Sequence, residues 1–535
     1  MDIPVNFLTW GMAFLPILLL IVLMVGFHWG AAEAAVVGML VTTASSLLLY
    51  RADLTLIAME SAKGIWNALV ILLIIWTAIL LYQVGDEAKA FQAIRQGMRK
   101  LLPNELLLVL AMGWVFESFL QGITGFGVPV AVGAPLLIGI GMQPMWAVIL
   151  PLLGQSWGNT FGTLAAAWDS LAMTAGLAAG SDAYFQAAFW TALFLLFWDM
   201  VVGIVICWFY GKGKAVRKGL PAVLLLALIQ GGGELILSQV NTTLSCFLPS
   251  LLSLAAILLL GRSRAYRQEW RVEDSPIMCS RTAETEKEKP GSMTLLQAFV
   301  PYFLLSALTI AVLMIPALNQ VLGAWKIGFA FPETVTGYGY VNAASDCYSP
   351  IAPLTHASMF LLLSALTGIV YYRRHGWIGE GGVRRIFARS IGMTLPSGMA
   401  VVGLIIMSRI MGGSGQTVVL AKGIANVLGR GYAFLAPFVG LLGTFMTGSN
   451  MSSNILFGEF QKTTAELLHL NAAAVLGGQS AGGAIGSAVS PSKIILGTTT
   501  ANVLGQEGEV LRHVLRITIP AALLIGAALF LQTAV

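Results

Sequence analysis

The chain carries GQSWGNTFGT at 154–163 and GQSAGGAIGS at 478–487, two copies of one glycine-bracketed motif about 324 residues apart. A Thr-Gly pair precedes each copy at almost the same distance: Thr124-Gly125 lies about thirty residues before the first, and Thr447-Gly448 about thirty-one before the second. Because the spacing between two separate motifs recurs, whole structural units have been duplicated rather than one short loop. This duplication suggests a two-fold membrane transporter.

The composition of the chain places it in a membrane. Of its 535 residues 57% are hydrophobic and 10% are charged, too much apolar surface to hide in a soluble core. A helix needs roughly 20 apolar residues to cross a bilayer, and runs of that length favour helices over a barrel. We therefore predict an all-α polytopic membrane protein with about twelve spanning helices and two re-entrant hairpins. The predicted spans are 7–27, 31–50, 67–84, 144–168, 183–209, 219–236, 241–261, 295–317, 350–372, 391–411, 471–495 and 513–534.

Basic residues indicate how these spans are oriented. Lys and Arg collect in short cytoplasmic loops, so the net charge of +5 reflects membrane orientation and does not imply nucleic acid. Placing all the basic loops inside leaves both termini outside. It also leaves Arg51 and Lys63 outside, a mild conflict with the rule. The basic loops are 95–100, 212–218, 262–271, 373–389 and 512–516.

The same trace predicts that the two halves are inverted. Span 67–84 runs from outside to inside, whereas its counterpart 391–411 runs from inside to outside. Each half also holds a segment that begins and ends on one side, as a pair of spans or as a re-entrant hairpin with a Thr-Gly tip. The longest polar stretch, 262–292, is the expected cytoplasmic divide. The predicted divisions are a first inverted repeat at 1–210 (hairpin 105–142, broken helix 144–168), linking helices and a cytoplasmic loop at 211–292, and a second inverted repeat at 293–535 (hairpin 431–468, broken helix 471–495).

Glycine breaks within apolar helices are the candidate substrate site. In hydrocarbon an unpaired backbone group is costly unless it faces protein, water or cargo, so broken helices mark binding sites. Half-helix N-termini attract anions, and exposed carbonyls attract cations. Close helix packing at small residues is the alternative explanation, but in both copies Gln, Ser, Asn and Thr interleave with the glycines. The candidate substrate-binding residues are Thr124, Gly125, Gly127, Gln155, Ser156, Asn159, Thr447, Gly448, Ser449, Asn450, Ser453, Gln479, Ser480 and Ser490.

Charged residues within apolar segments complete the set, because they are costly in hydrocarbon and so indicate function by default. Arg409 and Lys493 are expected to attract a substrate carboxylate, Arg through a bidentate fork and Lys as a point charge, unless they snorkel to the interface. A proton symporter also needs a carboxyl group that is neutral in part of its cycle; Glu117 is the first candidate and Asp169 the second. A structural ion pair between Asp169 and Lys493 is the alternative. Carboxyl groups of lower rank are Asp199 and Glu234.

Other classes of protein have little support in the sequence. It contains no HExxH, no GxSxG and no nucleotide-binding loop with lysine, so neither a membrane enzyme nor an ATP-driven pump is expected. The single duplicated site argues against a channel. The four cysteines are widely spaced and suggest neither a disulfide framework nor a metal site. We expect a secondary transporter without metal or cofactor, whose partners are a small carboxylate, protons and the lipid bilayer.

At the two Thr-Gly tips the chain resembles the lactate permease family. The family's Gly-Phe-Gly-x-Pro-Val-Ala motif stands at 125–131, its Thr-Gly-Ser-x-x-Ser-Ser-Asn turn at 447–454 and its Gly-Gly-x-x-Gly-x-x-x-Ser-Pro run at 482–491. The likeness covers most of the chain. It implies a proton-coupled importer of L-lactate, glycolate, D-lactate or a related 2-hydroxymonocarboxylate in a bacterial inner membrane. Sodium coupling or transport of another small organic anion is the alternative.

The resemblance also implies membership of a wider ion-transporter superfamily with paired re-entrant hairpins and elevator-like motion, whose members suggest a homodimer. This chain departs from the family pattern within the duplicated motif. Where the family typically carries Asn-Thr, both copies here have Gln-Ser, at 155–156 and 479–480. The acidic residue usually met before the first tip is replaced by Gln121. The symmetric replacement indicates an altered substrate site.

Overall fold

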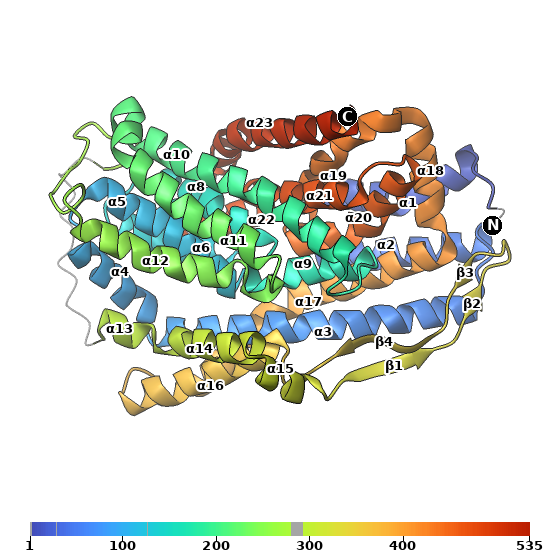
Figure 1. Ribbon diagram of the computed structural model, residues 1–535, viewed down its shortest axis with the longest axis horizontal. Coiled ribbons are helices and arrows are strands. Elements are labelled where there is room, and N and C mark those ends of the chain that lie inside the picture. The colour runs from blue at the N-terminus through green and yellow to red at the C-terminus, as the bar shows by residue number, and fades with distance from the viewer. Residues whose placement is uncertain (1–2, 28, 126, 280–292, 535) are drawn as a thin grey trace.

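The computed structural model describes residues 3–27, 29–125, 127–279 and 293–534, and its helices run mostly along the long axis of the molecule (Figure 1). Phe126 and the last part of the predicted polar linker, 280–292, lie outside these residues. By length and composition nine of the described helices could cross a membrane, or ten if one bent pair forms a single span. The chain is therefore a multi-pass helical protein, as its composition predicts.

The first half of the chain alternates long and short helices. Its elements are α1 (Phe7–Ile21), the π-helix η1 (Val22–Gly26), α2 (Ala31–Leu48), α3 (Leu54–Glu87), α4 (Ala90–Leu101), α5 (Glu105–Leu110), the π-helix η2 (Ala111–Val115), α6 (Phe116–Ile123), α7 (Val128–Ile138), α8 (Pro144–Gly154), the 3₁₀ helix η3 (Trp157–Asn159), α9 (Gly162–Thr174) and α10 (Asp182–Ala227). The linking elements are the π-helix η4 (Leu228–Gly232), α11 (Gly233–Leu237), the 3₁₀ helix η5 (Thr242–Leu244) and α12 (Phe247–Arg262).

The second half repeats much of this order. Its elements are α13 (Leu295–Ala298), α14 (Val300–Met314), α15 (Pro316–Gly323), β1 (Ile327–Phe331), β2 (Thr334–Val335), β3 (Val341–Asn342), β4 (Ser345–Ile351), α16 (Ala357–Arg374), α17 (Gly382–Ser414), α18 (Gln416–Leu428), the 3₁₀ helix η6 (Gly429–Gly431), α19 (Tyr432–Thr447), α20 (Asn450–Leu467), α21 (Ala472–Gly486), the 3₁₀ helix η7 (Ser487–Val489), α22 (Pro491–Thr500) and α23 (Glu507–Ala534). From α3 to α10 and from α17 to α23 a long helix, a short helix, a two-armed hairpin, an interrupted segment and a long helix follow one another. The orientation of either set relative to a membrane stays a prediction.

The long helices α3 and α17 pack against each other along the centre of the molecule. An ion pair joins Glu60 near the start of α3 to Arg409 near the end of α17. At the other end, Glu87 at the end of α3 accepts hydrogen bonds from Arg385 at the start of α17. The two helices are therefore antiparallel and fastened at both ends.

Both central helices are longer than their predicted spans, 67–84 and 391–411. The side chain of Asp53 caps α3 by accepting a hydrogen bond from the backbone of Leu56, so the helix begins thirteen residues before the apolar run. Its first turns carry Glu60 and Lys63, which an apolar window excludes. Both are nonetheless buried, because they form an ion pair with each other.

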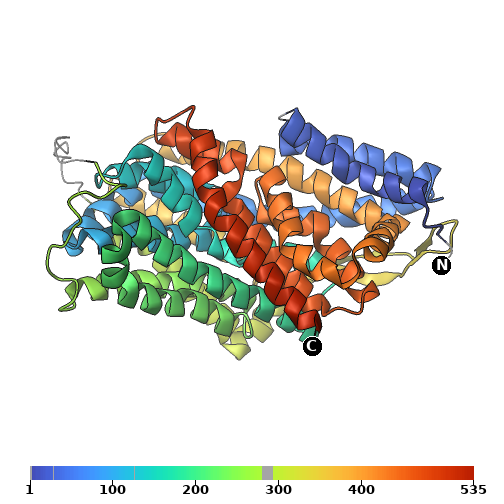
Figure 2. The same cartoon turned by 90° about the horizontal axis from the view of Figure 1, so that it is seen from above.

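Several other predicted spans differ from the observed helices. Segments 144–168 and 471–495, each predicted as a broken helix, are interrupted as α8–η3–α9 and α21–η7–α22. Segment 295–317 comprises α13, α14 and the start of α15, and the chain bends by 86° between α14 and α15. The spans predicted at 183–209 and 219–236 belong to one run of helix, 182–237, with a kink at Gly211 and Lys212. Figure 2 shows α23, in red, crossing the molecule obliquely.

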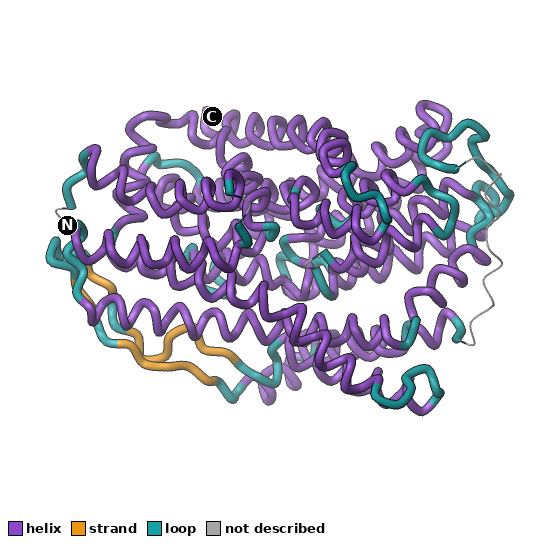
Figure 3. The backbone as a smooth tube through the Cα atoms, turned by 180° about the vertical axis from the view of Figure 1, so that it is seen from behind, coloured by secondary structure: helices purple, strands orange, loops and turns teal. Residues whose placement is uncertain are grey.

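Two short antiparallel strand pairs, β1–β4 and β2–β3, were not predicted by the search for apolar runs. They lie beside α3 at the end of the molecule that carries the N-terminus (Figures 1 and 3). The indole of Trp66 on α3 donates a hydrogen bond to the carbonyl of Ser349 on β4 (3.1 Å), and its ring meets Phe329 on β1 edge-on. The start of the predicted span 350–372 belongs to this strand region, and α16 begins only at Ala357.

Candidate substrate site

The first copy of the duplicated motif forms a sharp break in the chain. α8 ends at Gly154, a single 3₁₀ turn follows, and the next helix begins at Gly162. Directly after this, Thr163, Leu164 and Ala165 have φ values of 50°, 50° and 71°. Such left-handed residues cost about 1–2 kcal/mol each when they carry a side chain. Strain of this kind is concentrated at functional sites, so the break is a candidate binding site.

The second copy keeps its helix through the motif. α21 runs unbroken to Gly486, and the interruption comes at η7 and at Ser490, just before Pro491 begins α22. A Cβ at Gly482 would run into the backbone of Pro437, and one at Gly486 would lie 2.8 Å from the backbone of Leu441. The glycines of the second copy thus allow close helix packing, the alternative that the sequence left open. In the second half the helix is therefore interrupted only at the end of the duplicated motif and just after it.

Polar side chains from the two copies meet in the middle of the protein. The Oγ atoms of Thr160 and Ser480 lie 3.0 Å apart. Asn450, at the second hairpin tip, donates to Thr160 (3.0 Å), and Asn159 donates to Ser487 (2.8 Å). All five side chains are at least nine-tenths buried. The duplicated motifs and the second tip therefore form one hydrogen-bonded network.

A cavity of about 30 Å³ lies beside this network. Its volume suffices for roughly two water molecules. Of the predicted site residues, the structure places Gly125, Asn159, Gly448, Ser449, Asn450 and Lys493 in its wall. The wall also contains residues that the prediction omitted: Gln121, Gly162, Thr163, Ala166, Ala167 and Met451.

Lys493 is the cation of this cavity. Its side chain extends from the first turn of α22, is only 5% exposed, and donates to Asn159 Oδ1 at 3.3 Å. Within the described chain no carboxylate pairs with it, and the proposed ion pair with Asp169 does not form. The N-terminus of α22 adds a partial positive charge to the same place. A buried cation without an anion is suited to binding an anionic ligand.

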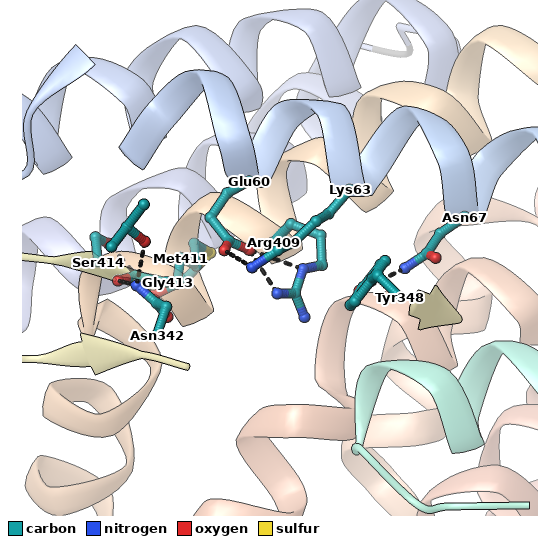
Figure 4. Close-up of polar contacts among 10 residues, drawn as sticks. Glu60, Lys63, Asn67, Asn342, Tyr348, Arg409, Met411, Gly413 and Ser414 are labelled. Atoms are coloured by element: carbon teal, nitrogen blue, oxygen red, sulfur yellow. Dashed lines mark hydrogen bonds and ion pairs between the residues drawn. The ribbon is translucent and has the colours of Figure 1, made fainter. Parts of the chain in front are cut away.

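Arg409 lies in different surroundings (Figure 4). Its Nη2 and Nε atoms donate to Glu60 Oε2 at 2.5 and 3.0 Å, while Lys63 Nζ lies 2.8 Å from Glu60 Oε1. One buried carboxylate thus binds two cations, one at each oxygen. Tyr348 on β4 places its ring 5.6 Å from both cations. Arg409 is not in the cavity wall, and we call the set Glu60, Lys63 and Arg409 the ion cluster.

The sequence prediction omitted Glu60, although two observations could have led to it. Glu60 and Lys63 stand three residues apart just before an apolar run, a spacing that brings two helical side chains together. Arg409, inside a predicted span, also requires a partner, because an unpaired charge in hydrocarbon is costly. Arg51, the second conflict with the predicted orientation, stacks on the ring of Tyr338 at 4.7 Å.

The two duplicated glutamines differ in their contacts. Gln479 Oε1 accepts from Gln461 at 2.8 Å, and its Nε2 donates to Ser453 Oγ at 3.1 Å. Gln155 is equally buried, yet neither polar atom of its side chain has a hydrogen-bond partner among the described residues. Ser156 accepts from the indole of Trp198 at 2.7 Å. Gln479 is therefore part of the helix packing, whereas Gln155 keeps free hydrogen-bonding capacity.

The remaining predicted residues surround the cavity without lining it. The hydroxyls of Thr124 and Thr447 donate to carbonyl groups one turn earlier in their own helices. Ser490 shares a hydrogen bond with Ser492, next to Gly448. Gly127 adopts a φ of 82° and faces the aliphatic part of Lys493. These residues shape the two tips.

The two predicted proton carriers lie on different helices, and neither lines the cavity. Glu117 on α6 is fully buried, and its carboxyl oxygens have no hydrogen-bond partner in the described chain. A Cβ added at Gly133 on α7 would run into this carboxyl group, so the missing side chain leaves space for it. Asp169 on α9 is only partly buried and lies close enough to Tyr184 to affect it electrostatically.

In the described chain, membrane-length helices surround a polar cavity whose wall holds one cation, an arrangement typical of a membrane transporter. The chain belongs to the L-lactate permease family, whose sequence profile matches residues 11–535. It is similar to the L-lactate permease of Halalkalibacterium halodurans, with 24% identity over 94% of this chain and 93% of that protein. The L-lactate permease and the glycolate permease GlcA of Escherichia coli K12 are 25% and 26% identical, each over 88% of this chain and 85% of theirs. The crystal structure of the YdaH transporter of Alcanivorax borkumensis matches with 12% identity and a TM-score of 0.42, over 86% of this chain and 84% of that one.

Proposed function

We propose that this protein imports L-lactate or a related 2-hydroxymonocarboxylate, such as glycolate or D-lactate, together with protons across a bacterial inner membrane. Relatives that align over most of their length are named for L-lactate and for glycolate. The observation that carries the proposal for this chain is the unpaired Lys493 in the wall of the central cavity.

Lys493 would bind the carboxylate of the substrate. A buried lysine presents a compact charge that a small anion can approach closely, and the N-terminus of α22 reinforces it. Without an internal anion, the charge of Lys493 is compensated only when substrate is present. This arrangement favours the bound state of an anion over the empty cavity.

Two amide oxygens in the cavity wall suit the 2-hydroxyl group. Gln121 and Asn450 both line the cavity and are 2% exposed, and Gln121 Oε1 and Asn450 Oδ1 have no hydrogen-bond partner among the described residues. The 2-hydroxyl of the substrate would donate a hydrogen bond to one of these two amide oxygens. An acid without that hydroxyl would leave both oxygens without a hydrogen-bond donor. Cation and acceptors together match the two functional groups of a 2-hydroxy acid.

Glu117 is the first candidate for the coupled proton, and Asp169 stays the second. A buried carboxylate with no cation nearby would be costly, so Glu117 is expected to hold a proton in this conformation. It stands on the arm that ends at the first hairpin tip, two turns before Gly125. A change at that tip would alter the surroundings of the carboxyl group and allow its proton to leave.

Transport requires movement, because the cavity is too small for a three-carbon acid together with its water. We propose an elevator-like cycle in which the hairpins and interrupted segments move against a scaffold formed by α3 and α17. The ion cluster that joins these two helices supports their role as the rigid part. A homodimer would hold such a scaffold in the membrane, and the mass of the purified protein in detergent tests this.

Uptake into proteoliposomes tests the proposed function. We expect labelled L-lactate or glycolate to accumulate when the outside is more acidic, and accumulation to collapse with a protonophore. Lys493→Gln should abolish most of this uptake, whereas the exposed control Lys326→Gln should match the wild type. Uptake that requires a sodium gradient instead would contradict proton coupling.

Competition by propionate, which lacks the 2-hydroxyl, tests the role of Gln121 and Asn450. Propionate should compete poorly with labelled lactate; equal competition would contradict that role.

A further inference from the structure

A second group of buried acidic side chains lies outside the cavity wall. Asp199 on α10 and Glu234 on α11 are both fully buried and close enough to influence each other electrostatically. The indole of Trp114 donates to Asp199 Oδ1 at 2.8 Å. Asp199 Oδ2 and both carboxyl oxygens of Glu234 have no hydrogen-bond partner among the described residues.

No cation offsets this pair within the part of the chain that the structure describes. The thiol of Cys246, at the N-cap of α12, lies close enough to both carboxyl groups to interact with them electrostatically. From η2 Asp199 meets the neutral indole of Trp114, and on η4, which packs against α10 and α11, Gln230 keeps an unpartnered Oε1 while its Nε2 donates to Ser253. Two carboxylates in such surroundings cannot both be ionised, because like charges repel strongly where water is excluded. The pair must therefore hold at least one proton.

One glycine of the first break lies between a neighbour of this acidic pair and a residue of the cavity wall. A Cβ at Gly158, in the middle of the first break, would lie 2.7 Å from Cys246 Sγ and 3.6 Å from Gln121 Cγ. Gly158 thus separates Cys246, which faces the acidic pair, from Gln121, which lines the cavity. Any rearrangement of the break would change the surroundings of both the cavity and the pair.

We propose that Asp199 and Glu234 form a shared proton-binding site that is used in transport, distinct from Glu117 and from the substrate cavity. The inference rests on the proposed function, since it assigns a second proton site to the same carrier. Binding of an anion at the cavity favours a protonated pair, because substrate and pair face the same break in a region of low dielectric. Release of the substrate removes this stabilisation and lets one proton leave.

Flux measurements separate proton coupling from substrate binding. In proteoliposomes we expect Asp199→Asn and Glu234→Gln to lower accumulation driven by a pH gradient at least tenfold. Exchange of external labelled lactate for internal lactate at equal pH needs no net proton movement, so it should stay within threefold of wild type. Glu466→Gln, a carboxyl substitution on the exposed part of α20, is the matched control and should change neither rate. Variants that keep wild-type accumulation would overturn the inference.

Infrared difference spectra of the full-length protein, with and without lactate, give a second measurement. We expect the substrate to change the C=O band of a protonated carboxyl group, and we expect Asp199→Asn or Glu234→Gln to remove or shift that band. A band that is unchanged in both variants would overturn the inference even if exchange were lost through misfolding.

The flux measurements also distinguish failure of this inference from failure of the proposed function. If wild-type vesicles transport no 2-hydroxy acid, the proposed function itself fails. If they do so with the pH gradient and both variants remain coupled, only the shared proton site fails.

Discussion

The ion cluster and the cavity both contain a buried cation, and they differ in what surrounds it. Arg409 and Lys63 share the carboxylate of Glu60, so the charges of the ion cluster are met within the protein. Lys493 meets only the neutral amide of Asn159. Charge that is balanced internally fixes two helices to each other, whereas charge that is not balanced is available to a ligand. Under the proposed function, basic side chains therefore stabilise the fold in one region and bind the substrate in the other.

The largest effect should come from removing the shared anion. Glu60→Gln removes the carboxylate that Lys63 and Arg409 share and leaves the buried Lys63 without its ion-pair partner, and breaking a buried ion pair in this way costs about 3–5 kcal/mol. We expect a marked fall in the unfolding temperature of the purified protein in detergent, with Glu466→Gln unchanged as the control. An unfolding temperature equal to wild type would show that the ion cluster does not hold α3 to α17.

Lys493→Gln should produce the opposite pattern. It removes a buried charge that no anion offsets, so the unfolding temperature should stay the same or rise. Loss of the counter-charge should raise the apparent KM for lactate about 30-fold or more, equivalent to about 2 kcal/mol. Parallel measurements of thermal unfolding and concentration-dependent uptake check both expectations. A destabilised variant with normal KM would place Lys493 with Arg409 as a structural cation.

The duplicated glutamines extend the comparison to neutral groups. Gln479→Ala removes buried hydrogen bonds to Gln461 and Ser453, which keep their bonds to Ala436 and Gly440, at a cost of about 1–3 kcal/mol for the two bonds. Gln155→Asn breaks no hydrogen bond that the structure contains and should alter substrate preference with little change in stability. Competition by glycolate, D-lactate and L-lactate, together with unfolding curves, distinguishes the two. Equal loss of stability in Gln479→Ala and Gln155→Asn would contradict the different roles assigned to the two glutamines.

The smallest effect is expected where an ion pair faces water. Arg385 is half exposed in its contact with Glu87, and solvent screens such pairs strongly. Arg385→Ala should leave the unfolding temperature close to wild type and uptake unaffected. A loss as large as that of Glu60→Gln would show that exposure does not separate these two ion pairs.

Much of this organisation is predictable from the sequence, because duplicated motifs survive as local patterns. The cavity wall contains Gly125, Asn159 and Asn450, all of which the repeat identifies. The partner of Arg409 lies 349 residues away in the chain, and local patterns do not identify such a contact. The strands beside α3 are short and lack a long apolar run, so a search for membrane spans passes over them.

The second break shows another limit of sequence patterns. The same glycine spacing is compatible with a break in a helix and with close packing of two helices. The residues that contact the glycines determine which of the two forms. At Gly482 the backbone of Pro437 approaches closely, and the helix continues. At Gly158 the neighbours are the side chains of Cys246 and Gln121, and the chain is broken.

The left-handed turn at Thr163, Leu164 and Ala165 has a thermodynamic consequence for the cycle. Three such residues together raise the free energy of this conformation by about 3–6 kcal/mol relative to a right-handed path. A two-state equilibrium moves from one per cent to ninety-nine per cent with about 5.5 kcal/mol. Relaxation of this one turn therefore represents enough free energy to change which conformation dominates. In the proposed cycle, loss of the contacts that hold the turn left-handed would therefore shift the population toward another conformation.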